Sequence, residues 1–321
     1  MKMRRLTSMG GSESSRGNRT QRHGWLLVDK DKGWTSSQVV SRVRSVLRIR
    51  KAGHAGTLDP IATGLLPVAL GEATKTIPFL VEGIKTYEFV VQWGEARDTD
   101  DAEGAMIRRS KVRPKEAEIR SALASFQGEI FQRPPDYSAI KVNGKRAYQL
   151  ARAKRPVALA ERQVTVKKLE LLEVLNGDSA AFRLKCGKGV YVRSIARDLG
   201  KALGTEGYVT QLRRLGVGAF DLEAAISLAQ LEELKDIKDL AGRLLPLAEG
   251  LPGVPVFCVD PDQAARLRQG QAVVLTAAPT SGGVRVEAPA VMCAILADRP
   301  VALVDFAKGE IRPRRVFNYA A

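Results

Sequence analysis

The stretch from Lys51 to Lys75, KAGHAGTLDPIATGLLPVALGEATK, holds one carboxylate, Asp59, before its closing Gly-Glu pair. It lacks the Gly-Lys-Ser/Thr of a phosphate-binding loop and the Gly-x-Ser-x-Gly of a hydrolase nucleophile, and no second acid is close enough to suggest a metal pair. A lone carboxylate acts as a nucleophile, a base or an electrostatic stabiliser. Carboxylates suit glycosidic centres, where they attack or stabilise a developing oxocarbenium ion. The stretch therefore indicates chemistry at a glycosidic bond.

An alternative for Asp59 requires no chemistry. Asp followed by Pro is typical of a helix start, with Asp59 as the cap and Pro60 at the first helical position. The flanking residues weaken this alternative. Gly56 gives the backbone shapes closed to other residues, and Gly64 would cut short a helix that began here.

The charge of the chain favours a polyanionic partner. Its 321 residues include 51 Lys or Arg against 35 Asp or Glu, a formal charge of +16. Such an excess binds phosphates and releases their counterions, so nucleic acid is the first candidate. A basic surface without a ligand is the alternative.

Cysteine and histidine usage argues against metal chemistry. Cys186, Cys258 and Cys293 are far apart and not at metal-ligand spacing, so we expect buried thiols, with neither a disulfide framework nor a zinc site. Of the two histidines, His23 follows the polar beginning of the chain, which leaves His54 as the one available to a folded site.

Hydrophobic patterns predict mixed strands and helices without a regular strand-helix-strand period. Thr35-Ser36 can cap a helix whose apolar residues recur from 39 to 47. We expect strands at 24–30, 65–71, 86–94, 162–175 and 181–187, the proline of 65–71 marking an edge or a strand start. We expect helices at 72–80, at 115–126 and within 188–204, the last capped by Ser194, and an acidic loop at 97–105.

Composition divides the chain into three parts. Residues 1–22 are basic and polar and predict a disordered arm. Residues 23–250 form the main domain, and a shift at LPGVPV introduces a small, separate β-rich module at 254–321 with a helix at 261–269. Within the main domain, 131–160 interleaves basic and aromatic residues around an Asn143-Gly144 turn, which favours an RNA-binding insertion over an ordinary solvated hairpin.

Six segments together resemble one family. They are the Asp59 stretch, KTYE (85–88), RDTDDAEG (97–104), PPDYSAIKVNGKRAY (134–148), GVYVRSIARDLG (189–200) and QLRRLGVGAF (211–220). This set is similar to the TruB family of tRNA pseudouridine-55 synthases and covers about residues 24–248 in order. GVYVRS departs conservatively from the family's usual Gly-Thr-Tyr-Ile-Arg-Thr. The C-terminal module resembles the family's PUA-like RNA-binding domain by position and size more than by residues.

The resemblance implies a reaction and a set of residues. The family converts uridine 55 in the T-loop of tRNA to pseudouridine with no cofactor and no metal, and Asp59 matches its catalytic aspartate. Each further match has an ordinary alternative, such as strand core or a surface charge. By resemblance, Tyr87 stacks on the target base, Arg193 pairs with the aspartate, Tyr191 lies near the carbon that loses its proton, Leu212 lines the pocket, and His54 helps to hold the T-loop with the uridine flipped out.

The resemblance also implies an α+β fold, with a mixed and largely antiparallel sheet of the pseudouridine synthase type flanked by helices. We expect a cytoplasmic monomer that binds the T-arm of tRNA and has no membrane span, since no apolar run approaches about 20 residues. Two other functions stay open: a guide-RNA-dependent synthase, which shares the GTLDP motif, and a non-catalytic tRNA-folding chaperone. GLLPVALGEATK is more similar to the stand-alone bacterial enzymes. The order of bond-making steps and further RNA substrates stay open.

Overall fold

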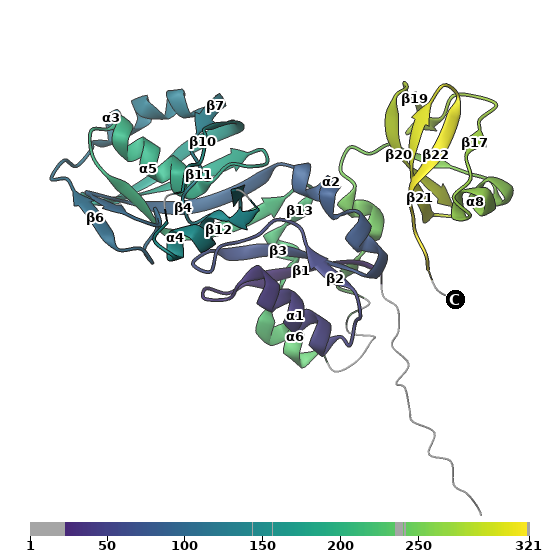
Figure 1. Cartoon of the computed structure of the whole chain (residues 1–321), viewed down its shortest axis with the longest axis horizontal. Helices are drawn as coiled ribbons and strands as arrows, with labels where there is room; N and C mark the ends of the chain where they lie inside the picture. The colour runs from purple at the N-terminus through teal and green to yellow at the C-terminus, as the bar shows by residue number, and fades with distance from the viewer. Residues whose placement is uncertain (1–22, 143, 156, 235–239, 241, 320–321) are drawn as a thin grey trace, which may run out of the picture.

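The computed structural model describes residues 23–142, 144–155, 157–234, 240 and 242–319 (Figure 1). The expected arm at 1–22 and Asn143 of the expected turn lie outside the described residues. No helix in the described ranges is both long enough and apolar enough to cross a membrane.

The main domain is built on an eleven-stranded sheet in the order β14-β1-β3-β12-β4-β11-β10-β7, with β2, β13 and β15 paired beside this path. Most neighbours are antiparallel, and β1–β14 and β12–β3 are parallel, which confirms the mixed, mainly antiparallel sheet. The strands are β1 (Gly24–Lys30), β2 (Ala52–His54), β3 (Thr63–Leu70), β4 (Lys85–Trp93), β7 (Gly128–Gln132), β10 (Arg162–Asn176), β11 (Ser179–Cys186), β12 (Gly207–Val217), β13 (Phe220–Asp221), β14 (Ile226–Ser227) and β15 (Leu244–Leu245).

Helices and small hairpins surround this sheet (Figure 1), with α3 packed against β10 and α5 packed against β12 and β4. The α-helices are α1 (Ser36–Val46), α2 (Ile77–Glu82), α3 (Glu116–Ala122), α4 (Ala147–Arg152), α5 (Val192–Ala202) and α6 (Leu228–Glu233). The 3-10 helices are η1 (Gly71–Lys75), η2 (Leu123–Phe126), η3 (Leu222–Ala224) and η4 (Leu247–Gly250). The hairpins pair β5 (Glu95–Arg97) with β6 (Met106–Arg109) and β8 (Lys141–Val142) with β9 (Lys145–Arg146).

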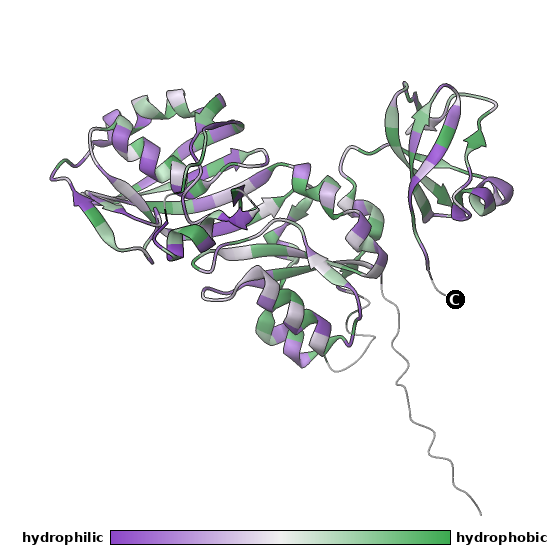
Figure 2. Cartoon of the chain, in the orientation of Figure 1, coloured by the Kyte–Doolittle hydropathy of each residue, from purple (hydrophilic) through white to green (hydrophobic). Residues whose placement is uncertain are grey.

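The first strand shows why its sequence is a continuous apolar run. Leu26 and Val28 belong to the core that α1 and α5 share with the sheet. Trp25 and Leu27 point to a second core on the opposite face. A strand buried on both faces needs apolar residues at every position, whereas longer strands such as β10 alternate, as Figure 2 shows along the sheet.

The C-terminal module is a five-stranded sheet with one α-helix. Its elements are β16 (Val256–Cys258), α8 (Pro261–Arg268), β17 (Val273–Val274), β18 (Thr280–Ser281), β19 (Val284–Arg285), β20 (Ala290–Leu296), β21 (Arg299–Ala307) and β22 (Glu310–Val316), of which β18 and β19 form a separate hairpin. The module was expected to be separate, and this is wrong at one face. Cys293, Leu303 and Phe317 pack into the same apolar core as Trp25.

Pro67 lies in the middle of β3, inside the sheet, whereas its presence predicts an edge strand or a strand start. Leu70 pairs with both β1 and β2, and Gly64 pairs with both β1 and β12, so β2 and β12 share one edge of β3. Leu65 to Pro67 lie in the gap between these two partners. A missing amide hydrogen costs little where no strand faces it. The sheet therefore forks along β3, and the Asp59 loop leaves from this fork.

Three other expectations need correction. Helix α5 begins at Val192 with Tyr191 as its N-cap, because Ser194 lies inside the first turn and donates its Oγ to the carbonyl of Arg133 at 2.9 Å. Cys258 is exposed, whereas the other two cysteines are buried. His23 belongs to the folded part, since its Nδ1 accepts a hydrogen bond from the Glu72 amide at 2.9 Å.

Candidate active site

Asp59 lies in the loop between β2 and β3, and no helix begins after it. Its carbonyl accepts a hydrogen bond from the amide of Ala62 at 3.1 Å, which closes a turn, and β3 starts at Thr63. The helix-cap alternative is therefore wrong. The carboxylate, 36% exposed, is free for another purpose.

The loop is held on the side of α1 by contacts to the residues before and after Asp59. Ser36, at the start of α1, accepts from the Leu58 amide at 2.9 Å and donates to the Leu58 carbonyl at 3.1 Å. The carbonyl of Pro60 accepts from the amide of Gly33 at 2.8 Å and from Nζ of Lys30 at 3.4 Å. A site on a short loop reaches a fixed geometry only when such contacts support it.

Arg193, in the first turn of α5, forms an ion pair with Asp59 at 2.9 Å. The side chain of Arg193 is only 4% exposed, and its guanidinium also donates to the carbonyls of Thr99 at 2.8 Å and Tyr137 at 3.0 Å. On a further side, Asp101 approaches its Nε at 3.6 Å. One planar cation thus joins the Asp59 loop, the 97–105 loop and the 131–160 segment.

Five of the six residues singled out by the resemblance line one cavity of about 270 Å³: Asp59, Tyr87, Tyr191, Arg193 and Leu212. Tyr87 comes from β4, Tyr191 from the start of α5 and Leu212 from β12, so three elements meet at the Asp59 loop. Burial raises the pKa of both phenols. Both therefore stay neutral near pH 7 and offer apolar ring faces with a hydroxyl at one end.

His54 does not line this cavity. It lines a neighbouring one of about 860 Å³, in which Asp59 and Arg193 also take part, together with Tyr137, Tyr148 and Arg152 of the 131–160 segment. Burial, and after it the charge of Arg214, lowers the pKa of the His54 imidazole. A neutral histidine therefore lines the larger cavity, together with residues of the basic 131–160 segment.

Sequence reasoning missed three buried residues of this site. Gln132 brackets the backbone of Tyr191, accepting from its amide at 2.8 Å and donating to its carbonyl at 3.2 Å. Asp101 stands behind Arg193, and its Oδ1 accepts from Oγ of Thr99 at 2.6 Å. Arg214 lines the Asp59 cavity. Asp101 and Arg214 lie within segments that resemble the family, but a segment match does not say which of its side chains meet in space.

Two charged groups near the site have shifted pKa values. Burial lowers the pKa of Lys30 to about 8, against the raising effect of Asp59. Burial raises the pKa of Asp100 to about 6, although Arg197 pairs with it at 2.8 Å and lowers it. Shifted pKa values cluster at functional sites, where several charged groups are buried close together.

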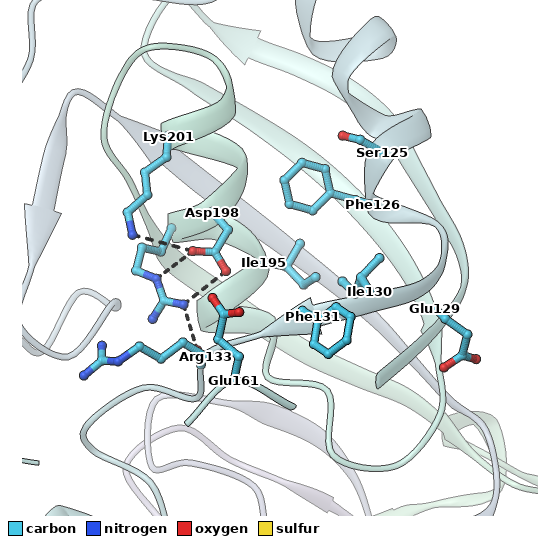
Figure 3. A pocket seen from close by; sticks show the side chains of 11 residues that line it. Ser125, Phe126, Glu129, Ile130, Phe131, Arg133, Glu161, Ile195, Asp198 and Lys201 are labelled. Atoms are coloured by element: carbon cyan, nitrogen blue, oxygen red, sulfur yellow. Dashed lines mark hydrogen bonds and ion pairs between the residues drawn. The ribbon is translucent and has the colours of Figure 1, made fainter. Parts of the chain in front are cut away.

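A further cavity, of about 470 Å³, is lined by none of the six predicted site residues, although Phe131 and Arg133 of the 131–160 segment line it. Figure 3 shows Asp198 and Lys201 of α5 on one side of it and Phe126 and Phe131 on another. Asp198 is engaged by Lys201 at 3.8 Å and by Arg197 at 2.8 Å. Across the described ranges, no group of three His, Cys, Asp or Glu is placed to hold a metal ion.

Comparisons with known proteins agree with this geometry. The family model for the N-terminal domain of TruB family pseudouridylate synthases matches residues 44–192, and the tRNA pseudouridylate synthase B C-terminal domain matches residues 193–251. The tRNA pseudouridine synthase B of Cereibacter sphaeroides is 48% identical over 295 residues, covering 92% of this chain and 96% of that protein. The protein of the same name from Rhodospirillum rubrum is 48% identical over 300 residues, with coverage of 92% and 96%.

Solved structures support the fold. A chain of a Cbf5-Nop10-Gar1 complex has a TM-score of 0.71 at 27% identity and covers 92% of this chain and 85% of its own length. A chain of an H/ACA RNP bound to a substrate RNA has a TM-score of 0.69 at 23% identity and covers 92% and 86%. These likenesses confirm the expected pseudouridine synthase fold. Given the family models and the relatives, this chain belongs to the TruB family of pseudouridylate synthases.

Proposed function

We propose that this protein is a tRNA pseudouridine synthase that isomerises uridine 55 in the T-loop, with Asp59 as its catalytic residue. The observation that carries the proposal is the Asp59 carboxylate, paired with Arg193 at 2.9 Å in a cavity that also presents Tyr87, Tyr191 and Leu212. Relatives that are 48% identical over almost their whole length are named tRNA pseudouridine synthase B.

The reaction needs no net gain or loss of atoms in the nucleotide. The bond from N1 of uracil to the ribose breaks, the base turns, and carbon 5 joins the ribose carbon. Carbon 5 then gives up its proton, and N1 ends with one. Asp59 serves as the nucleophile or the base in this reaction.

The other residues have supporting roles in this proposal. Flipping a uridine out of a folded loop costs a few kcal/mol, which stacking on Tyr87 offsets. Arg193 orients the Asp59 carboxylate, Tyr191 lies at the carbon that loses its proton, and Leu212 closes the pocket. His54 stands in the neighbouring cavity with the 131–160 segment, where it would support the flipped T-loop.

The remaining parts of the chain would bind RNA. Tyr137, Tyr148 and Arg152 line the cavity next to Asp59, which supports the 131–160 segment as the part that grips the T-arm. We propose that the C-terminal module at 254–321 is PUA-like and contacts tRNA outside the T-loop. We also propose that the enzyme acts as a monomer in the cytoplasm, where its tRNA substrate is made. No cofactor or metal enters this mechanism.

The test compares wild type, Asp59→Asn and Asp59→Ala, with Asp178→Asn as a surface control. Asn keeps the size of the side chain and removes the anion, so turnover should fall by at least about a thousandfold. Tritium release from carbon 5 of labelled uridine in tRNA, measured in single turnover without guide RNA, reports the chemistry, and filter binding reports affinity. Binding should survive, because phosphate contacts and stacking do not need the Asp59 charge.

The same experiment decides between the alternatives. Near-wild-type release by Asp59→Asn would reject Asp59 as the catalytic residue. A wild type that binds tRNA but releases no tritium, with or without a guide RNA, would favour a chaperone or binding function. A wild type that is inactive on bare tRNA but active with a guide RNA would favour the guide-dependent function.

A further inference from the structure

Arg214, on β12, is a fully buried cation that the proposed mechanism does not use. It is 1% exposed, and within the described ranges no carboxylate lies within 4 Å of its guanidinium. A buried charge without an ion partner is costly unless hydrogen bonds hold it. Two backbone carbonyls do so: Nε donates to Leu65 at 2.8 Å and Nη2 donates to Gly56 at 3.1 Å.

These two carbonyls are the two ends of the loop that carries Asp59. Gly56 follows β2, and Leu65 lies in β3, at the gap where β2 and β12 diverge along one edge of that strand. The guanidinium therefore replaces a missing strand partner and spans the base of the loop. Leu58 and Pro60, in the middle of the loop, are held separately by Ser36 and Lys30.

The glycines of the Asp59 motif pack against the same arginine. Gly56 has a φ of +84°, and a Cβ there would lie 3.2 Å from Nη1 of Arg214. Gly64 has a φ of +98°, and a Cβ there would lie 2.2 Å from the carbonyl oxygen of Arg214. The left-handed φ and the close approach together require glycine at both positions. The motif and Arg214 thus form one unit, although they are far apart in the sequence.

We propose that Arg214 is a positioning residue that fixes the base of the 56–65 loop and thereby aims the Asp59 carboxylate at the substrate cavity. The proposal rests on the assignment of Asp59 under the proposed function. A misplacement of a reacting group by about 1 Å costs about a hundredfold in rate. The effect of losing Arg214 should therefore appear in the chemical step and not in tRNA affinity.

The test compares Arg214→Lys and Arg214→Gln with Arg213→Lys. Lysine keeps the charge but donates from a single nitrogen, so it cannot reproduce the separate positions of Nε and Nη2, and glutamine loses the charge. Arg213 is the matched control, because it directly precedes Arg214 on β12. Its side chain is 41% exposed and pairs with Asp29 at 2.7 Å. We expect both Arg214 variants to lose about 10 to 100-fold in single-turnover rate, to bind tRNA within about threefold of wild type, and the control to be unchanged.

Amide hydrogen exchange supplies a readout that does not depend on activity. Exchange should rise in a peptide that spans 55–66 and stay unchanged in the C-terminal module. If the Arg214→Gln variant does not fold, Arg214→Lys alone tests the positioning role of Arg214. An unchanged rate in a folded Arg214 variant would overturn the proposal and leave Asp59 in place. Equal losses of rate and binding with exchange raised throughout would also overturn it, as a general structural effect. Failure of the Asp59 assignment would appear separately, as activity in Asp59→Asn.

Discussion

Arg193 is the arginine that pairs directly with the proposed catalytic carboxylate. Arg193 contributes its donors to Asp59, to the Thr99 carbonyl and to the Tyr137 carbonyl, and it does so from a side chain that is almost fully buried. The guanidinium is planar and rigid, so these contacts fix its direction as well as its charge. A substitution that keeps the positive charge of Arg193 but changes its geometry should therefore separate the effect of position from the effect of charge.

We expect Arg193→Lys to lose about a hundredfold in single-turnover rate although it keeps the positive charge. The lysine ammonium is a point donor and cannot hold two backbone carbonyls and the Asp59 carboxylate in one plane. Arg183→Lys is the control, because Arg183 forms an ion pair with Glu88 away from both cavities. Wild-type rates for Arg193→Lys would show that charge alone is enough.

Helix α5 connects the site to the 131–160 segment. The carbonyl of Arg133 accepts from Ser194 at 2.9 Å and from Arg197 at 2.7 Å, both on α5. Gln132 is tied to Tyr191 just before the helix. The base of the segment is thus anchored, while its outer part carries the basic residues that line the larger cavity.

We expect tRNA binding to depend strongly on salt, and part of this dependence to come from the outer part of the segment. Alanine at Arg152, Lys154 and Arg155 should reduce the magnitude of the slope of log affinity against log salt by about 2 to 3. Each phosphate contact that is lost removes the release of about one counterion on binding. Filter binding at several salt concentrations measures the slope.

A control of equal charge tests whether location matters. Lys168 of β10 lies opposite Lys185 of β11 in the sheet, and Arg183 is also on β11. Alanine at these three positions removes the same charge outside both cavities. Equal slopes for the two triple variants would contradict an RNA-binding role of the segment.

The sequence could predict elements and a local motif, but few of the contacts between distant segments. GWLLVDK and the Thr35 cap are local patterns, and both are confirmed. Asp59 can be identified from the sequence because the glycines and proline around it form an unusual local motif. Ser194 was misassigned because its partner, the Arg133 carbonyl, comes from another segment. The Arg214 contact depends on the fork of β2 and β12 along β3, which no periodicity reveals.

At the scale of the whole molecule, the beginning and the end of the described chain meet at η1. The ring of His23 lies edge-on to Tyr319, with centroids 5.0 Å apart. Glu72 accepts from the Asn318 amide at 2.8 Å, and Lys75 donates to the Val316 carbonyl at 2.6 Å. These contacts attach the C-terminal module to the main domain beside the shared apolar core.

His23 makes this attachment sensitive to acid. Burial lowers its pKa from the usual 6.5, against the raising effect of Glu72. Its Nδ1 accepts from the Glu72 amide, which only the neutral ring can do. The unfolded chain therefore binds the proton more readily than the folded one. The stability from His23 is present above about pH 6.5 and is lost as the pH falls toward its folded pKa.

His23→Asn tests this, because an amide oxygen can replace Nδ1 as an acceptor without titrating near neutral pH. The stability of wild type relative to His23→Asn should fall as the pH drops below about 6.5, measured by urea unfolding at a series of pH values. The chain has two histidines, and the pKa of His54 is also lowered by burial. Proton NMR should thus show two imidazole resonances that both titrate below 6.5, and the variant assigns them. A His23 resonance that titrates at or above 6.5 would contradict the buried, accepting ring and its part in holding the module.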